Sequence, residues 1–425
     1  MLASTSPLSE WLTWLETLSP VEINLGLERV ERVLNTLQLT LPQDLLLIAG
    51  TNGKGSSVVM ADALLRARGL RVGAYTSPHI IRYNERIVVD GNAVDDATIT
   101  AAFATVEAAR GDTMLTYFEF GTLAAAVIFA AAKVDVCLLE VGLGGRLDAT
   151  NAFTPSASLI TNVTLDHCDW LGDNVEAIAE EKAGVMRSGR PTVYGSDAVP
   201  KSILRQAKAC GAVLLRSGVD FDSRIGDDSH WTWRGPSGEL LQLQAPGLSG
   251  DFQIGNAAAV LMLLESAGLA DNLDSALVNS VLPELALAGR MQRMQAFDKH
   301  WIFDVAHNPA AAEALAATLA ATDFAGETIA IAGLLEDKDL QGVIGPLLDV
   351  VDQWIAIPAS SSRTLSAKEL GRQIANLSGR PCIIATSASE AVEFARRRAS
   401  EDDRILVTGS FFTVAPLISQ LTNNS

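Results

Sequence analysis

Glycines, a lysine and two hydroxyl side chains follow an apolar stretch near the start of the chain, in the order Gly-Thr-Asn-Gly-Lys-Gly-Ser-Ser over residues 50–57. Glycines let backbone N–H groups turn toward phosphate oxygens, a helix N-terminus adds partial positive charge, and a lysine can reach the outer phosphates. Gly55 separates Lys54 from the first hydroxyl, so the order departs from the general GxxxxGK[ST] pattern. A strand expected at 45–49 and a helix expected at 56–68 flank the segment. It therefore predicts a site for the phosphates of an ATP-type nucleotide.

A carboxylate ends the apolar strand expected at 134–140. Parallel sheets present such side chains at the carboxyl ends of their strands, where they can ligate a nucleotide-bound magnesium ion. A lone carboxylate in this position can equally be a cap or a salt-bridge partner. The glycines that follow, with Asp148 and Asn151 after them, favour the ligand interpretation for Glu140.

Three of the five histidines lie among polar residues in expected loops: His79, His167 and His307. A hydrogen-bonded structural role is the commoner one for such residues. His167, however, follows the strand expected at 157–161, the next strand after the one that ends in Glu140, so a neutral imidazole could join a metal shell there. Lys182 lies among acidic residues of an expected helix, and composition alone favours a solvent-exposed side chain.

Short β-prone stretches alternate with helical periodicity from residue 45 onward, which is typical of βαβ units around a mostly parallel sheet. Between residues 218 and 245 the pattern changes to short segments with turn residues and tryptophans, which predicts β-hairpins. A second alternating series begins with a strand expected at 301–305. We therefore expect an α/β protein with an N-terminal P-loop-type domain (1–290), a linker (291–297) and a smaller C-terminal Rossmann-like α/β domain (298–425).

Composition restricts the partners of the chain. Its 425 residues contain 32 Lys and Arg against 50 Asp and Glu, a formal net charge of −18, which argues against nucleic-acid binding. The four cysteines form no CxxC pair, so we expect neither a disulfide framework nor a zinc cluster. The longest apolar stretch falls far short of the roughly 20 residues that span a bilayer. We expect a soluble, cytoplasmic monomer without a membrane partner.

Together the motifs resemble those of the bacterial bifunctional dihydrofolate synthase/folylpolyglutamate synthases, members of the Mur ligase superfamily. The resemblance rests on the order and spacing of seven segments: residues 50–57, 77–79, 116–119, 140–151, 165–167, 181–184 and 304–309. It extends from about residue 8 to about residue 417. The resemblance implies that Mg²⁺ and ATP convert a substrate carboxylate to an acyl phosphate, which the amine of L-glutamate attacks. The acceptors implied are 7,8-dihydropteroate and reduced folates.

The resemblance also implies roles for particular residues. ATP would be bound by Thr51, Asn52, Gly53, Lys54, Gly55, Ser56, Asn256, Arg290 and Asp304. Magnesium would be bound by Ser56, Ser77, Glu140, His167 and a carbamylated Lys182. Lys54, Lys182 and His307 would act in catalysis. The pterin or folate would contact Ile23, Asn24, Leu25, Thr116, Tyr117, Phe118, Glu119, Leu147, Asp148 and Ala149. Two of these rings, Tyr117 and Phe118, could stack on the pterin, and the Glu119 and Asp148 carboxylates could accept hydrogen bonds from its amino groups.

Two positions depart from the family pattern: Asn24 stands where Asp is usual, and Ala288 where Pro is usual. Three alternative classes fit less well. A cell-wall Mur ligase would normally carry a further domain before the phosphate loop. A GTP-driven switch is suggested by the DxxG pattern at 169–172, but an Asn-Lys-x-Asp motif is missing. A non-catalytic nucleotide-binding module would leave the metal-type residues unexplained. Within the family, a monofunctional folylpolyglutamate synthase remains the alternative to the bifunctional enzyme.

Overall fold

The structure is a computed structural model that describes residues 3–19, 23–226, 230–322 and 324–423. The chain divides into two compact units. The first unit comprises Met1–Thr164, Cys168–Pro246 and Gln253–Leu285, and the second comprises Leu165–His167, Gly247–Phe252 and Ala286–Ser425. Two short segments from the first part of the chain therefore belong with the C-terminal unit, a feature that the division expected at residue 290 lacks.

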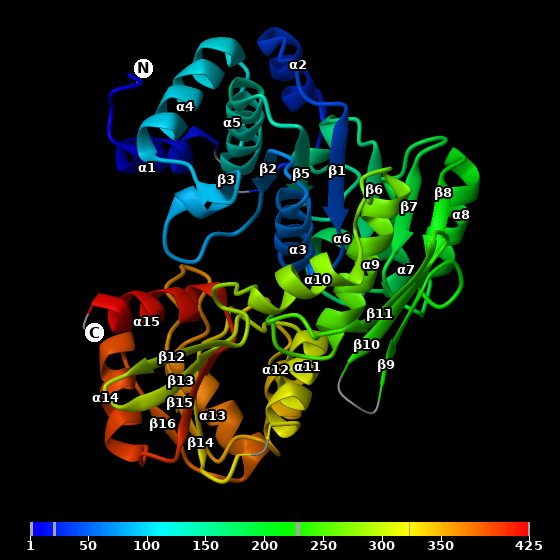
Figure 1. Ribbon diagram of the computed structural model, residues 1–425. Coiled ribbons are helices and arrows are strands. Elements are labelled where there is room, and N and C mark those ends of the chain that lie inside the picture. Colours follow the sequence, from blue (N-terminus) through cyan, green and yellow to red (C-terminus); the bar gives the residue numbers. More distant parts are fainter. Residues whose placement is uncertain (1–2, 20–22, 227–229, 323, 424–425) are drawn as a thin grey trace. The chain divides into compact units, whose positions relative to one another are not determined.

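The first unit contains an eight-stranded sheet in the order β4-β3-β2-β5-β1-β6-β7-β8 (Figure 1). The pairs from β2 through β8 are parallel, whereas β3 and β4 add an antiparallel edge. The strands are β1 Asp44–Ala49, β2 Val72–Tyr75, β3 Ile87–Val89, β4 Asn92–Ala93, β5 Val136–Glu140, β6 Ala157–Ile160, β7 Pro191–Tyr194 and β8 Val213–Arg216. A separate antiparallel sheet contains β9 Asp222–Ile225, β10 Trp231–Gly235 and β11 Gly238–Leu243.

Ten helices are described from Leu8 to Val281: α1 Leu8–Leu18, α2 Glu28–Leu37, α3 Lys54–Ala67, α4 Asp96–Arg110, α5 Tyr117–Ala132, α6 Cys168–Leu171, α7 Val175–Ala183, α8 Lys201–Cys210, α9 Phe252–Ser266 and α10 Ser275–Val281. Helix α3 follows β1 directly and packs against β1 and β5. Among all described residues, no helix is both long enough and apolar enough to cross a membrane.

Strand β1 lies between β5 and β6, and its residues from Leu45 to Ala49 are all buried. A parallel strand covered on both faces is apolar throughout rather than alternating, which explains the run Leu-Leu-Leu-Ile-Ala. Burial of each leucine contributes on the order of 2 kcal/mol relative to an exposed side chain. The carboxyl end of β1, from which the glycine-rich segment leaves, is therefore firmly held.

The second unit has its own six-stranded sheet, in the order β12-β13-β17-β14-β15-β16, which is parallel except for the β12–β13 pair. Its strands are β12 Gln292–Ala296, β13 Lys299–Phe303, β14 Thr328–Ala332, β15 Gln353–Ala356, β16 Cys382–Ile384 and β17 Arg404–Thr408. Its helices are α11 Pro309–Ala320, α12 Leu340–Ile344, α13 Ala367–Ser378, α14 Ala388–Arg398 and α15 Phe411–Asn423.

The expected α/β class is confirmed, with a mostly parallel first sheet and a smaller second one. Residues 291–297, expected as a linker, instead mostly form β12, which makes a hairpin with β13. The two turn residues, Phe297 and Asp298, have φ values of 52° and 57°. Such turns usually contain Asn and Gly, so the sequence gives no hairpin signal here. The strand expected at 301–305 accordingly starts earlier, at Lys299.

Candidate active site

The glycine-rich segment between β1 and α3 requires glycine at two positions. Gly50 and Gly53 have φ values of 143° and 85°, which side-chain-bearing residues rarely adopt. A Cβ on Gly50 would lie 1.8 Å from Thr161 Oγ1, and one on Gly53 would lie 2.7 Å from Asn256 Oδ1. The backbone of this loop therefore approaches its neighbours as closely as glycine permits.

Hydrogen bonds fix the loop to the segment that follows β6. The Thr51 backbone N–H donates to the Asn162 carbonyl, and the Asn52 N–H donates to Asn162 Oδ1, both at 3.0 Å. The Thr161 hydroxyl donates to the Asn52 carbonyl at 2.6 Å. These bonds fix the part of the loop that precedes α3 and leave the N–H groups of the first turn of α3 unused by Asn162 and Thr161.

Two lysines meet at one carbonyl oxygen. Lys54 Nζ donates to the carbonyls of Gly50 and Thr51 at 3.0 and 3.1 Å. Lys182 Nζ, from α7, donates to the same Gly50 carbonyl at 3.0 Å, and this residue is only 4% exposed. The interpretation of Lys182 as a solvent-exposed helix lysine is therefore wrong, and the structure brings it to the phosphate loop.

Glu140 ends β5 beside the start of α3. One carboxylate oxygen, Oε2, accepts a hydrogen bond from the Ser77 backbone N–H at 3.0 Å. A Cβ on Gly55 would lie 3.8 and 3.9 Å from the two Glu140 oxygens, so the carboxylate lies against the first turn of α3. Ser56 is the next residue of that turn. The predicted ligands Ser56, Ser77 and Glu140 thus come from neighbouring positions in the first unit.

The oxygen atoms of these residues fit a magnesium ion. Mg²⁺ prefers oxygen ligands, keeps several waters and uses one or two carboxylates together with substrate phosphates. In the described part of the chain, no three or more His, Cys, Asp or Glu residues gather into a metal-binding group. A site of one carboxylate and hydroxyl groups beside a phosphate loop agrees with this preference. His167, the fourth predicted ligand, belongs to the second unit.

A polar network from α9 reaches the same turn of α3. Gln253 Nε2 donates to Ser56 Oγ at 3.3 Å, and Asn256 Nδ2 donates to Gln253 Oε1 at 2.9 Å. All three residues are buried. Asn256 was expected at the nucleotide, and the structure places it against Gly53, whereas nothing in the sequence pointed to Gln253.

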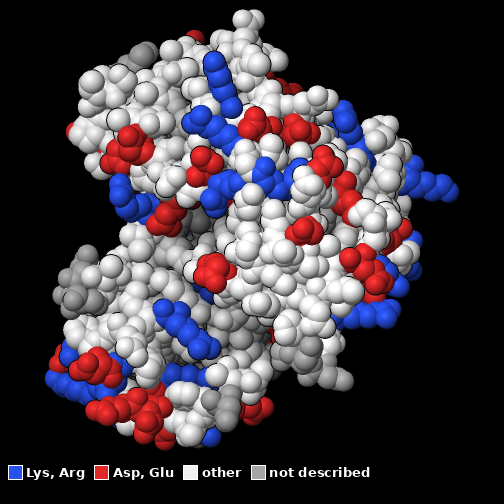
Figure 2. Space-filling view, viewed as in Figure 1, with Lys and Arg blue, Asp and Glu red and all other residues white. Residues whose placement is uncertain are grey.

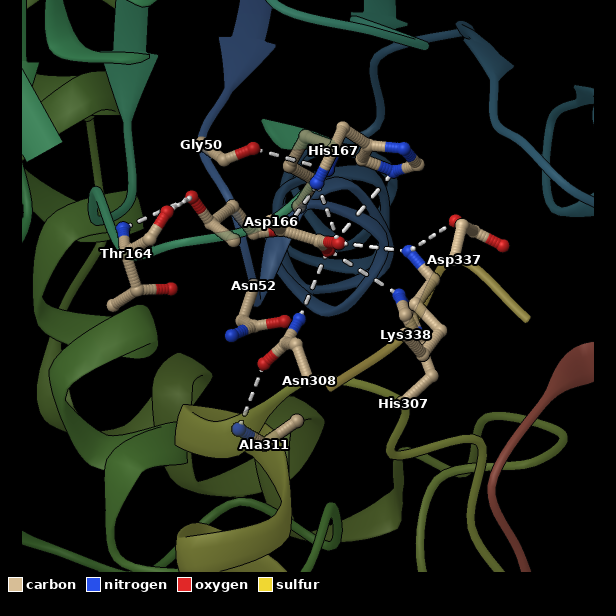
Figure 3. Close-up of polar contacts among 12 residues, drawn as sticks. Gly50, Asn52, Thr164, Asp166, His167, His307, Asn308, Ala311, Asp337 and Lys338 are labelled. Carbon is tan, nitrogen blue, oxygen red and sulfur yellow. Dashed lines mark hydrogen bonds and ion pairs between the residues drawn. The ribbon is translucent and has the colours of Figure 1, made fainter. Parts of the chain in front are cut away.

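Asp166 is the centre of a buried charge cluster in the second unit (Figure 3). Its carboxylate accepts from Lys338 Nζ at 2.9 Å and Asn308 Nδ2 at 3.0 Å, and His307 Nε2 lies 3.4 Å away. Burial alone would raise the pKa of Asp166, but the hydrogen bond from His307 and the charge of Lys338 outweigh it, so this pKa lies well below its usual range. The cluster fixes His307 and Asn308 at the start of α11.

In the same unit, Asp304 holds the backbone of two neighbouring segments through hydrogen bonds. Its carboxylate accepts from the backbone N–H groups of Met291 and Ala306, both at 2.9 Å. Burial raises the pKa of Asp304, and the Arg290 charge opposes this rise. The Arg290 guanidinium lies 5.2 Å from the centre of the Phe411 ring. Three residues expected at the nucleotide or in catalysis, Arg290, Asp304 and His307, therefore lie close together.

Both predicted pterin-binding carboxylates have ion-pair or hydrogen-bond partners within the chain. Glu119 forms an ion pair with Arg29 at 2.6 Å and accepts from the Thr116 backbone N–H at the start of α5. Asp148 accepts from the Leu143 and Thr150 backbone N–H groups at 2.9 and 3.0 Å. Both carboxylates therefore position local backbone.

The aromatic residues of the predicted pterin-binding segments lie against the sheet. Phe118 packs against Gly142, and its ring centre is 5.8 Å from that of Tyr75. Arg29 also donates to the Asn24 carbonyl, and Gly26 N donates to the Leu147 carbonyl at 3.4 Å. Segments 23–25, 116–119 and 147–149 are thus brought together. Arg29, which joins two of them, was missed because a lone arginine carries no sequence signal.

Two family models match the chain: the Mur ligase middle domain over residues 48–264, and the glutamate ligase domain of Mur ligases over residues 289–411. The fold and the phosphate loop are thus those of a Mur ligase. The dihydrofolate synthase/folylpolyglutamate synthase of Escherichia coli K12 is 40% identical over 413 residues, covering 97% of this chain and 95% of its own. The Haemophilus influenzae protein of the same name is 37% identical, with 97% of each chain covered.

Solved structures agree. The E. coli protein FolC in complex with DHPP and ADP has a TM-score of 0.93 at 39% identity, covering 100% of this chain and 99% of its own. A bifunctional folylpolyglutamate synthase/dihydrofolate synthase from Yersinia pestis, complexed with AMPPNP and Mn ion, has a TM-score of 0.91 at 40% identity, covering 99% and 100%. The chain belongs to the dihydrofolate synthase/folylpolyglutamate synthase family.

Gly53→Ala should damage both stability and the phosphate loop. The added Cβ would meet Asn256 Oδ1 at 2.7 Å on a backbone with φ 85°. We expect the free energy of unfolding to fall by about 1–3 kcal/mol and affinity for a non-hydrolysable ATP analogue to fall about tenfold or more. Gly69→Ala is the matched control, because Gly69 has φ 82° but nothing within 4 Å of the added Cβ. It should lose stability alone; equal nucleotide affinity in the two variants would contradict the loop geometry.

Asp166→Asn should destabilise the protein by about 3 kcal/mol at neutral pH, because it leaves the buried Lys338 charge without its closest partner. The folded-state pKa of Asp166 is depressed, so its stabilisation is present above the unfolded-state pKa of about 3.9 and is lost as the pH falls below it. Urea unfolding should therefore show that the difference in free energy of unfolding between the wild type and Asp166→Asn decreases toward about pH 3.

The double variant Asp166→Asn/Lys338→Met is the control for this pair. It removes the unpaired charge as well, so part of the lost stability should return. A double variant no more stable than Asp166→Asn would contradict the charge-pair explanation.

Proposed function

We propose that the chain is an ATP- and Mg²⁺-dependent ligase that adds L-glutamate to 7,8-dihydropteroate and to reduced folates. The observation that carries the proposal is the phosphate loop on which Lys54 and Lys182 converge, beside the buried Glu140 carboxylate. The E. coli relative complexed with DHPP and ADP, and another relative with Mn, AMPPNP and L-glutamate bound, support the same substrates.

The chemistry follows from the poor reactivity of carboxylates toward amines. Transfer of the terminal phosphoryl group of ATP to the substrate carboxylate gives an acyl phosphate and ADP. The uncharged amine of L-glutamate then attacks the acyl carbon, and the tetrahedral intermediate expels phosphate, leaving an amide. The protein mainly positions the reactants and stabilises charge on the transferring group.

Within this proposal, the loop from Thr51 to Ser56 binds the phosphates through the backbone N–H groups at the N-terminus of α3, since the Thr51 and Asn52 N–H groups already donate to Asn162. Lys54 leaves its carbonyl partners and turns its ammonium group to the transferring phosphoryl group. We assign further ATP contacts to Asn256, Arg290 and Asp304. We assign a catalytic role to His307. A magnesium ion, held by Ser56, Ser77, Glu140 and His167, would neutralise phosphate charge.

Lys182 completes this metal-binding set if it is carbamylated. Addition of CO₂ to its neutral amine forms an N–C bond and releases a proton, which replaces a cation by a carboxylate-like anion. The burial of Lys182 and its contact with the Gly50 carbonyl support this assignment, since the group lies against the phosphate loop.

The acceptor is assigned to segments 23–25, 116–119 and 147–149, where Tyr117 and Phe118 offer rings for the pterin. Glu119 and Asp148 would then bind it only by sharing or exchanging the internal partners described above. Their first role in the free chain is to hold these segments in place.

We also assign the protein to the cytoplasm, as a monomer that binds small molecules and no nucleic acid. Its net charge of −18 supports the last point, because phosphates of nucleic acids are repelled on average. On the face drawn in Figure 2, acidic and basic side chains are interspersed. Light scattering of the purified protein tests the monomer.

A product assay by mass spectrometry tests the central proposal. With magnesium, ATP and L-glutamate, both 7,8-dihydropteroate and tetrahydrofolate should gain glutamate while ADP accumulates, and Lys54→Ala should abolish turnover. Product from tetrahydrofolate alone would identify a monofunctional folylpolyglutamate synthase. Absence of both products from a protein that still binds ATP would refute the assignment of the acceptor.

Lys182→Ala should lose almost all activity, and added short carboxylic acids should restore a part by replacing the carbamate. The exposed Lys208 provides the control, since it lies on α8, which contains no predicted site residue. A carbamate resonance in ¹³C spectra after exposure to ¹³CO₂, absent from Lys182→Ala, would identify the modification. A fully active Lys182→Ala protein would remove the assignment.

A further inference from the structure

Arg86 is a buried cation that no carboxylate of the described chain neutralises. The residue is 9% exposed. Its Nε donates to His79 Nδ1 at 2.8 Å, and its Cζ lies 5.5 and 5.7 Å from the centres of the Tyr83 and Tyr117 rings. In the described residues it has no ion pair. Removing a guanidinium from water without a counter-charge costs stability, so its retention calls for another explanation.

Other arginines without a carboxylate partner satisfy their donors internally. Arg187 and Arg404 both donate through Nη atoms to backbone carbonyls. The Nη atoms of Arg86 donate to no carbonyl or carboxylate in the described residues. They are also not among the fully enclosed side-chain atoms that lack a partner, so this edge of the guanidinium keeps access to solvent.

Arg86 lies near two parts of the proposed site in the first unit: the predicted metal ligands and the acceptor segment. Its carbonyl accepts from the Thr76 N–H at 2.9 Å, and the N–H of the next residue, Ser77, donates to Glu140. On the other side, the Tyr117 ring under the guanidinium begins α5, in the segment assigned to the acceptor. Arg86 is therefore close to both the predicted metal ligands and the segment assigned to the acceptor.

We propose that Arg86 binds a substrate carboxylate through its two Nη atoms, an inference that rests on the proposed function. A guanidinium presents paired N–H donors that match the two oxygens of a carboxylate. His79 and the tyrosine rings hold its plane in one orientation. The buried Tyr75 hydroxyl interacts with the Arg86 guanidinium and is a further polar neighbour that helps to orient it. The folate-type acceptor and L-glutamate both carry such a carboxylate.

The test compares steady-state kinetics of Arg86→Met, Arg86→Lys and wild type, with KM measured separately for 7,8-dihydropteroate, tetrahydrofolate and L-glutamate. The KM of the substrate whose carboxylate is bound should rise about tenfold or more in Arg86→Met, and less in Arg86→Lys. A rise for both acceptors identifies the acceptor carboxylate. A rise for L-glutamate alone identifies the amino acid.

The unfolding temperature distinguishes carboxylate binding by Arg86 from a role in packing. Because Arg86→Met removes an unneutralised buried charge, the free variant should unfold at a temperature no lower than the wild type. Arg110→Met is the matched control, since the Arg110 side chain is only 12% exposed and lies over the Trp14 ring, but it has a carboxylate partner, Glu107. It should unfold at a lower temperature and keep every KM within about twofold.

Unchanged KM values in Arg86→Met, with or without a lower unfolding temperature, would overturn the inference while leaving the proposed function intact. A wild-type protein that ligates neither acceptor would instead contradict the proposed function. In that case the thermal shift produced by L-glutamate or 7,8-dihydropteroate still tests the site. A shift lost in Arg86→Met supports carboxylate binding, and an equal shift in both proteins refutes it.

Discussion

The carbonyl oxygen of Gly50 is the point on which the phosphate loop depends. It accepts hydrogen bonds from Lys54 and Lys182, which come from different helices, and it lies at the end of the fully buried strand β1. A carbonyl oxygen has two lone pairs and can therefore accept from both ammonium groups. The φ of 143° at Gly50 is one that residues with a side chain rarely adopt. The carbonyl thus holds two cations at the glycine-rich loop, and phosphate binding as proposed above would exchange their partners rather than create new order.

Other buried polar groups also have hydrogen-bond partners within the chain. Asp166, Asp304 and Asp148 all accept hydrogen bonds from the chain, and the first also has a lysine partner. Polar groups held this way are already desolvated and oriented, which lowers the cost of organising a site. Arg86 differs because no carbonyl or carboxylate of the described residues accepts from its Nη atoms.

The local parts of this arrangement can be predicted from the sequence. The run from Gly50 to Ser57 carries its own strand, turn and helix start, and β5 ends visibly in Glu140. Contacts between distant residues cannot be predicted in this way. Lys182 lies 132 residues from Gly50, and Lys338 lies 172 residues from Asp166, so nothing near either lysine indicates its partner. The hairpin of β12 and β13 was missed for another reason, since its turn lacks the usual Asn and Gly.

The tripeptide Leu165–His167 belongs with the C-terminal unit although it follows β6 of the first. The second unit is therefore not a continuous stretch of sequence: residues 286–425 alone would lack the carboxylate that Lys338, Asn308 and His307 share. If two related genes recombined at residue 285, Leu165–His167 would come from one parent. The partners of Asp166, which are His307, Asn308 and Lys338, would come from the other. This feature restricts exchange of the C-terminal unit to parents that keep an aspartate at the position of Asp166, and it couples the evolution of two otherwise separate folding units.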